Sequence, residues 1–201
     1  MQINATSLIS ALDDTLSRSS SSKSATILRD MLRLFTAEAK ALTTDCIAIF
    51  DDILIRLVDK VDEGSLIELS DALAAVPNAP PKTANQLARH RNIAVSGPLL
   101  RTSPVISEQT LADVVKGKNP AQVDAIIARD QIPDSVTDVL VEQGEAETVC
   151  KLIRNPAAAI SVRGFVKLIR RAENEPTLAA DIAERADLPY ELRAFLRLPA
   201  A

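Results

Sequence analysis

The residue types that most often carry chemistry are scarce in this chain. His90 is the only histidine, and the two cysteines, Cys46 and Cys150, lie far apart in apolar stretches. A structural zinc site needs four closely spaced ligands, so these three residues do not predict one. We expect His90 to end a helix between Arg89 and Arg91. Free cysteines behave as small hydrophobic residues, so we expect both to be reduced and buried, with a disulfide as the less favoured alternative.

Acidic residues form two groups that are candidates for cation sites. Asp51 and Asp52 are adjacent, and neighbours on a helix point about 100° apart, so we expect them to be solvated or to pair with Arg56. The second group is an acidic ridge of three residues spaced four apart: Asp134, Asp138 and Glu142. Carboxylates on one straight helix rarely surround an ion. We therefore predict no metal site, no cofactor and no catalytic residue, and hence no enzyme.

The most prominent cluster is basic. Residues 148–171 carry six basic residues and no acidic one, and these form the candidate interaction surface: Lys151, Arg154, Arg163, Lys167, Arg170 and Arg171. On a helix the last four span about 100° of arc, opposite Val162, Phe165, Val166 and Ile169. This pattern is typical of the solvated face of an amphipathic helix. Its uniform charge also fits an acidic protein surface or a phosphate-bearing ligand.

The elements that position these residues are predicted to be helices, because the composition and the spacing of apolar residues favour helices throughout the chain. The chain is 47% hydrophobic and 25% charged, which excludes general disorder. Ala and Leu dominate and only 5 of the 201 residues are glycine, which disfavours an all-β fold. We predict about ten helices. Several prolines mark predicted helix starts, with Asn-Pro pairs as N-cap and first residue: Pro81, Asn119-Pro120, Pro133, Asn155-Pro156, Pro176 and Pro189. Gly64, Gly117 and Gly144 are predicted to end helices in the left-handed conformation.

The predicted organisation has three parts. Residues 1–16 form an amphipathic helix, residues 17–24 a serine-rich linker, and residues 25–201 a single α-helical repeat domain. Weak internal repeats support the last part: residues 128–133 resemble 184–189, and residues 87–96 resemble 152–161. The fold class that we predict is all-α, with stacked antiparallel helical hairpins in a HEAT-like α-solenoid. An irregular α-helical bundle is the alternative.

Charge alternates in sign along the chain. Residues 45–75 and 119–147 are strongly acidic, whereas residues 82–118 and 148–171 are basic. This alternation predicts a surface striped by charge, which bears on the choice of partner. We expect little stabilisation from exposed charge pairs.

Five motifs occur in an order that resembles a known family. They lie at residues 50–57, 77–81, 92–100, 136–144 and 159–165. Together they are similar to the mostly alphaproteobacterial family called domain of unknown function 2336, over roughly residues 27–198. The resemblance implies an α-helical, HEAT-like protein and supplies no catalytic or binding residue. In place of a Ser-Gln-Ala-His-type run, this chain has residues 119–124 without a histidine.

These observations predict a non-enzymatic scaffold that binds an unknown protein partner or a second copy of itself. The alternative is a phosphate- or nucleic-acid-binding module that uses the basic blocks 82–118 and 148–171. The overall charge of −4 and the lack of aromatic residues among the basic ones disfavour that alternative. With no secretory signal and no long apolar segment, we expect a cytoplasmic protein without a membrane span.

Overall fold

The computed structural model describes residues 21–39 and 41–196, and these residues are all-α, as predicted. They form twelve helices and no strand; Ile132 and Ala158 make an isolated β-bridge. The predicted helix 1–16 lies outside the described residues, and so does the first half of the predicted linker. Residues 21–24 of that linker belong to the first helix described, α2.

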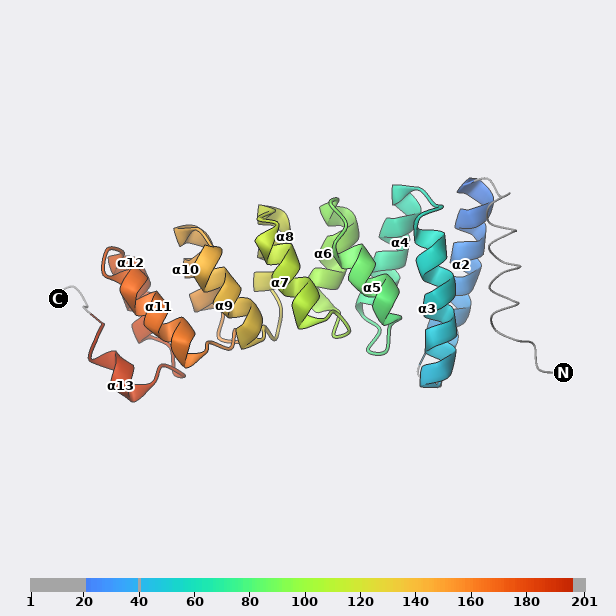
Figure 1. Ribbon diagram of the computed structural model, residues 1–201. Coiled ribbons are helices and arrows are strands. Elements are labelled where there is room, and N and C mark those ends of the chain that lie inside the picture. Colours follow the sequence, from blue (N-terminus) through green and yellow to red (C-terminus); the bar gives the residue numbers. More distant parts are fainter. Residues whose placement is uncertain (1–20, 40, 197–201) are drawn as a thin grey trace. The chain divides into compact units, whose positions relative to one another are not determined.

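The chain divides into two compact units, the first ending at Ser107 and the second beginning at Glu108. The first unit contains α2 (Ser21–Glu38), α3 (Thr44–Val58), α4 (Glu63–Ala74), α5 (Pro81–Ala88) and α6 (Ile93–Thr102). In this unit each helix packs on its neighbours in two rows, with α3 against α5 in one row (Figure 1). Helices α2, α4 and α6 form the other row, since α4 contacts both α2 and α6.

The second unit contains three helical pairs followed by a short helix. Its elements are α7 (Glu108–Lys116), α8 (Pro120–Ile127), α9 (Asp134–Gln143), α10 (Ala146–Arg154), α11 (Val162–Ala172), α12 (Pro176–Ala183) and α13 (Tyr190–Arg193). Helix α9 packs against both α7 and α11, and α10 packs against both α8 and α12 (Figure 1). Two rows of helices therefore enclose the core of this unit as well.

Side-chain caps set five of the helix starts in the described part of the chain. Thr43, Asp62, Asn92, Asn119 and Ser161 are N-cap residues whose side chains accept a backbone N–H from the first turn. Pro81, Pro120 and Pro176 are first helical residues, as predicted. A proline needs no hydrogen-bond acceptor there, because the first N–H groups of a helix have no partner within it.

Several predicted boundaries are wrong. Gly64, which the sequence predicts to end a helix, is instead the second residue of α4. Asn155 does not begin a helix; it ends α10, and its side-chain amide donates to the carbonyls of Ile127 and Arg129 at 2.6 and 3.2 Å. No described glycine has a positive φ, so left-handed glycine caps do not end these helices. At Gly144 the reason for glycine is space, because a Cβ there would lie 2.4 Å from the Leu140 carbonyl oxygen.

Helices α5, α7 and α9 share one pattern of burial. Over their first eight residues, two are exposed, two buried, two half-buried and two buried again. The last buried pair in each points into the core: Leu87 and Ala88, Val114 and Val115, Leu140 and Val141. Helix α11 follows the same pattern, with Leu168 and Ile169 as its last buried pair, except that its fifth residue, Val166, is exposed. Equivalent positions can therefore be compared from helix to helix.

Candidate interaction surface

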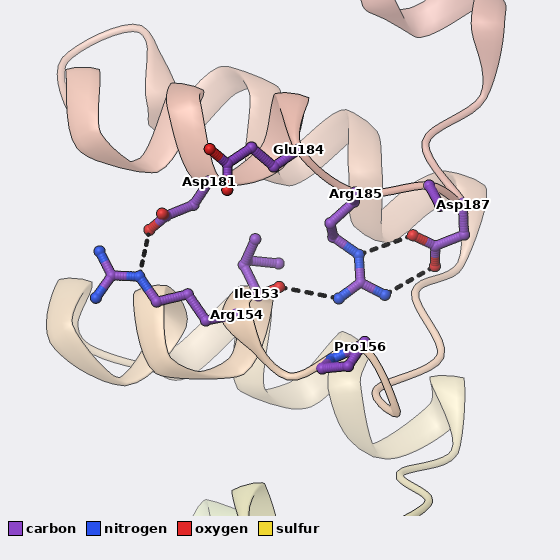
Figure 2. A pocket seen from close by; sticks show the side chains of 8 residues that line it. Ile153, Arg154, Pro156, Asp181, Glu184, Arg185 and Asp187 are labelled. Atoms are coloured by element: carbon purple, nitrogen blue, oxygen red, sulfur yellow. Dashed lines mark hydrogen bonds and ion pairs between the residues drawn. The ribbon is translucent and has the colours of Figure 1, made fainter.

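The structure divides the six predicted surface residues into side chains with a polar contact inside the unit and side chains without one. On α10, Lys151 lies 3.3 Å from Asp124 and 3.1 Å from Glu147. These carboxylates raise the pKa of the Lys151 ammonium. Arg154 lies 2.9 Å from Asp181, and that hydrogen bond raises its pKa too (Figure 2). Both basic residues of α10 are therefore neutralised locally.

Two of the four basic residues on α11 also serve contacts within the unit. Lys167 lies 3.3 Å from Glu142 of α9. Arg171 is half-buried and donates to the carbonyls of Val141 and Gly144, at 2.9 and 3.0 Å. The guanidinium thus caps the C-terminal end of α9, where unpaired carbonyls carry partial negative charge.

Arg163 and Arg170 are exposed, as Lys151 and Arg154 are, but they differ from the other four basic residues in their contacts. Within the described part of the chain, neither side chain has a hydrogen bond or an ion pair. Beside them lie Val162, 63% exposed, and Val166, 36% exposed. The sequence analysis placed these valines opposite the basic residues, together with Phe165 and Ile169. Phe165 and Ile169 are buried, but Val162 and Val166 are exposed beside the two arginines, so their predicted placement is wrong. We call Val162, Arg163, Val166 and Arg170 the α11 surface.

Helical geometry explains why these four residues share one face. With about 100° per residue, Val162, Val166, Arg170 and Arg163 fall within roughly 100° of arc. Phe165, Leu168 and Ile169 lie on another side of the helix and fill the core. The α11 surface therefore combines two exposed apolar side chains with two guanidinium groups.

One cavity of the second unit lies between the ends of α10 and α12 and measures about 420 Å³. Arg185, at its wall, is buried and donates to the carbonyls of Ile153, Asn155 and Ala158 at 3.0, 2.9 and 2.7 Å. Asp187 accepts from the same guanidinium (Figure 2). With its donors committed to protein oxygens, Arg185 holds two segments together and offers little to a bound anion.

A second cavity of about 380 Å³ lies among helices α7 to α10. Val115, Val123 and Leu140 supply apolar lining, and charged residues surround them, including Lys118, Asp124, Glu145, Glu147 and Lys151. Because Lys151 already contacts Asp124 and Glu147, charges of both signs are balanced here.

The chemistry-bearing residues of the sequence are not brought together. His90 follows the end of α5, as predicted, and its Nδ1 accepts the Asn92 N–H at 3.2 Å. Both cysteines are free. Cys46 is exposed, so its predicted burial is wrong; Cys150 is half-buried, and burial raises the pKa of its thiol. No group of three or more potential metal ligands occurs among the described residues.

Asp51 has a role that the sequence analysis missed. It is buried and accepts from the backbone N–H groups of Lys82 and Thr83, at 2.7 and 2.8 Å, and from the Thr83 hydroxyl at 2.7 Å. Asp51 therefore caps the N-terminus of α5, so solvation, one of its two predicted states, is wrong. The residue that precedes α5, Pro80, supplies no side-chain cap, and that was the available signal. Asp52 pairs with the Lys82 ammonium at 2.7 Å.

The acidic ridge of α9 faces α11. Asp138 accepts from the Ser161 hydroxyl at 2.7 Å, and Glu142 pairs with Lys167. These carboxylates thus serve the packing of one helix on the next. Arg185 was also missed, although the resemblance of residues 128–133 to residues 184–189 aligns it with Arg129.

The helices within the described residues are all too short or too polar to cross a membrane.

Comparison of the chain with known proteins gives one match, which is to a protein family. No curated protein and no solved structure matches the chain. Residues 95–197, about half of the chain, match the family described as an uncharacterised protein conserved in bacteria, DUF2336. The first two of the five motifs lie outside this match, and the last two lie within it. The chain therefore belongs to the DUF2336 family.

Proposed function

We propose that the chain is a non-enzymatic helical-repeat scaffold that binds a protein partner through the α11 surface. The observation that carries this proposal is the pairing of two exposed valines with two exposed arginines on one helix face. Elsewhere in the second unit, basic residues of the same block contact carboxylates or carbonyls. On the α11 surface, exposed apolar area and positive charge therefore lie together.

The repeat architecture that we propose is a HEAT-like α-solenoid of stacked helical hairpins. It is supported within each unit by the two rows of helices and by their recurring burial pattern. Polar contacts between neighbouring pairs support it too. Asn155 reaches the end of α8, and Arg185 reaches the end of α10. Solenoids typically bind partners along exposed helix faces.

A protein partner fits the α11 surface better than nucleic acid does. Phosphate binding relies on several unneutralised cations, and four of the six basic residues in block 148–171 are engaged internally. In block 82–118, Lys82 pairs with Asp52 and Lys116 lies 3.8 Å from Asp113. An acidic protein surface with apolar side chains would contact both the arginines and the valines. We place this scaffold in the cytoplasm.

The test is site-specific photocrosslinking of the full chain in bacterial cells. A photoreactive phenylalanine derivative replaces Arg163, and a matched control carries it at Ala121, which is exposed on α8. We expect a protein adduct of defined mass from position 163 only. Adding Arg170→Glu should weaken that adduct several-fold, because it reverses a charge of the surface. Equal adducts from both positions, or none, would contradict the proposal.

Nucleic acid binding has its own measurement. The natural chain is titrated with single- and double-stranded DNA and RNA at several salt concentrations. Arg163→Ala combined with Arg170→Ala is compared with Arg91→Ala combined with Arg101→Ala, which alters exposed arginines of the other basic block. We expect no binding near physiological salt. Salt-sensitive binding that one of these pairs abolishes would establish the alternative function.

A further inference from the structure

Within the first unit one ridge of α3 faces α5, and within the second unit one ridge of α7 faces α9 and one ridge of α9 faces α11. The members of each ridge lie four residues apart, and we call it the leading ridge of its helix. The leading ridges that can be compared are Asp51, Ile55 and Asp59 in α3 and its C-cap; Glu108, Ala112 and Lys116 in α7; Asp134, Asp138 and Glu142 in α9; and Val162, Val166 and Arg170 in α11.

The next helix covers the leading ridge of α3, and the contacts are polar. Asp51 accepts from Thr83 of α5 at both its backbone N–H and its hydroxyl. Further along, the side chain of Gln86 donates to Asp59 at 3.2 Å. The ridge is therefore in contact with α5 near both of its ends.

The leading ridges of α7 and α9 are covered in the same manner. Glu108 of α7 accepts from the Ser135 hydroxyl of α9 at 2.6 Å. Asp138 of α9 accepts from Ser161, the N-cap of α11, and Glu142 pairs with Lys167 further along each helix. The later residue of α9, Glu142, pairs with the later residue, Lys167, so α9 and α11 run parallel.

The leading ridge of α11 lies at the same helix positions as those of α7 and α9, but its residues are exposed. Val162 and Val166 are exposed there, and Val166 is the single departure from the burial pattern that α5, α7, α9 and α11 otherwise share. The following helix, α13, has four residues, and Tyr190 and Phe195 around it are 84% and 67% exposed. The described part of the segment that follows α12, residues 184–196, therefore leaves this ridge open.

The chemistry of the ridge also changes from α9 to α11. Where α9 has the carboxylates of Asp134, Asp138 and Glu142, α11 has two valines and Arg170. A helix that packed here would gain apolar contact along its first turns. Arg170 occupies the position in α11 that Glu142 occupies in α9, and Glu142 pairs with Lys167 of the next helix. A helix packed on α11 would therefore need a carboxylate at the position that corresponds to Lys167.

We propose that the leading ridge of α11 binds an α-helix of a partner protein, which lies parallel to α11 as α11 lies parallel to α9. This inference rests on the proposed function and specifies the partner. The bound helix has a small residue facing Val166 and an acidic residue three positions later facing Arg170. Gly164 and Lys167 show this spacing against α9, where a Cβ on Gly164 would lie 2.9 Å from the Asp138 carboxylate.

The experiment uses a synthetic helix as the probe and the full chain as the receptor. The probe has the sequence of residues 160–174 with Lys167→Glu, and a matched control peptide keeps Lys167. A hydrocarbon staple replaces Val166 and Arg170 in both peptides, which keeps them helical and removes the ridge from the probe itself. Binding is followed by fluorescence anisotropy at low and at physiological salt.

We expect the glutamate peptide to bind about tenfold more tightly than the lysine peptide, because one contact changes from repulsion to attraction. The Arg170→Glu chain should reverse this preference. Val166→Arg should weaken both peptides, and circular dichroism would verify that both variants fold. The inference would be overturned if the natural chain did not prefer the glutamate peptide, or if the Arg170→Glu chain kept the same preference as the natural chain.

Other occupants of the ridge give distinct results. A concentration-dependent dimer of the natural chain that Val166→Arg abolishes would assign the ridge to a second copy and overturn the inference. Disulfide trapping between Val166→Cys and Leu192→Cys, in a chain whose natural cysteines are replaced by serine, would assign it to the chain's own segment and overturn it too. If crosslinking at position 163 captures a protein and the peptides fail to bind, the proposed function stands and the helical partner falls.

Discussion

Single polar residues join neighbouring helices. Their side chains form hydrogen bonds with backbone groups at the end of another helix. Asp51 of α3 accepts N–H groups of α5, Arg171 of α11 donates to carbonyls of α9, and Arg185 donates to carbonyls of α10. Each side chain meets backbone groups that lack partners within their own helix. These contacts fix the register between helices, because they require the side chain and the helix end to coincide.

Asp51 provides the sharpest test at the scale of the residue. Asp51→Ala leaves the N–H groups of Lys82 and Thr83 and the buried Thr83 hydroxyl without this acceptor, so the free energy of unfolding should fall by about 2–3 kcal/mol. Asp52→Ala, which removes an exposed ion pair with Lys82, should cost much less, because solvent screens such pairs. Urea denaturation measures both. Similar losses for the two variants would contradict the capping role.

Most of these helices are too short to be stable alone, and several have only eight residues. Their stability depends on packing and on caps. The starts of α5, α8 and α12 were predictable, because proline at the first helical position restricts the backbone locally. The role of Asn155 was not, because its amide bonds to carbonyls of another helix that lies far away in sequence.

Asp62 makes the N-cap of α4 sensitive to pH. Its carboxylate accepts the Ser65 N–H at 2.8 Å, and this hydrogen bond lowers the pKa of Asp62 below its usual 3.8. A lowered folded-state pKa contributes stability above the unfolded pKa, and that contribution is lost as the pH falls through the folded value. Unfolding free energy should therefore decline below about pH 4.

Asp62→Asn should make that decline shallower, because asparagine caps a helix without titrating. Urea denaturation at several pH values, from near neutral to well below the usual pKa of aspartate, measures the slope. Asp71→Asn, an exposed substitution within the same helix, is the matched control for loss of an acidic residue. Equal slopes for the Asp62→Asn and natural chains would show that the cap does not contribute.

At the scale of the whole molecule, the alternating charge blocks take part in helix packing. Each of three ion pairs joins a basic block to an acidic one: Lys82–Asp52, Lys151–Asp124 and Lys167–Glu142. Instead of leaving simple charged stripes, the alternation places opposite charges on neighbouring helices. Such pairs add little stability individually, but like charges in these places would oppose the packing.

The two compact units should differ in their response to a core substitution. Phe165 is buried in the second unit, and Phe165→Ala should cost about 3–5 kcal/mol through lost contacts and a cavity. Hydrogen exchange should then accelerate mainly in residues 108–196. Leu87→Ala, in the first unit, should accelerate exchange mainly in residues 21–107. Equal acceleration in both units for either variant would show a single cooperative structure.

The sequence alone determined the all-α class, many helix starts and the family. These properties depend on local backbone preferences, on the spacing of apolar residues along one helix, and on motifs in order. It did not determine which polar residues remain exposed. Arg163, Arg170 and Arg171 belong to one basic cluster in the sequence, yet Arg171 caps α9 while the other two face solvent. Only the tertiary structure decided this, because the partners of Arg171 lie some 30 residues away in the chain and packing brings them together.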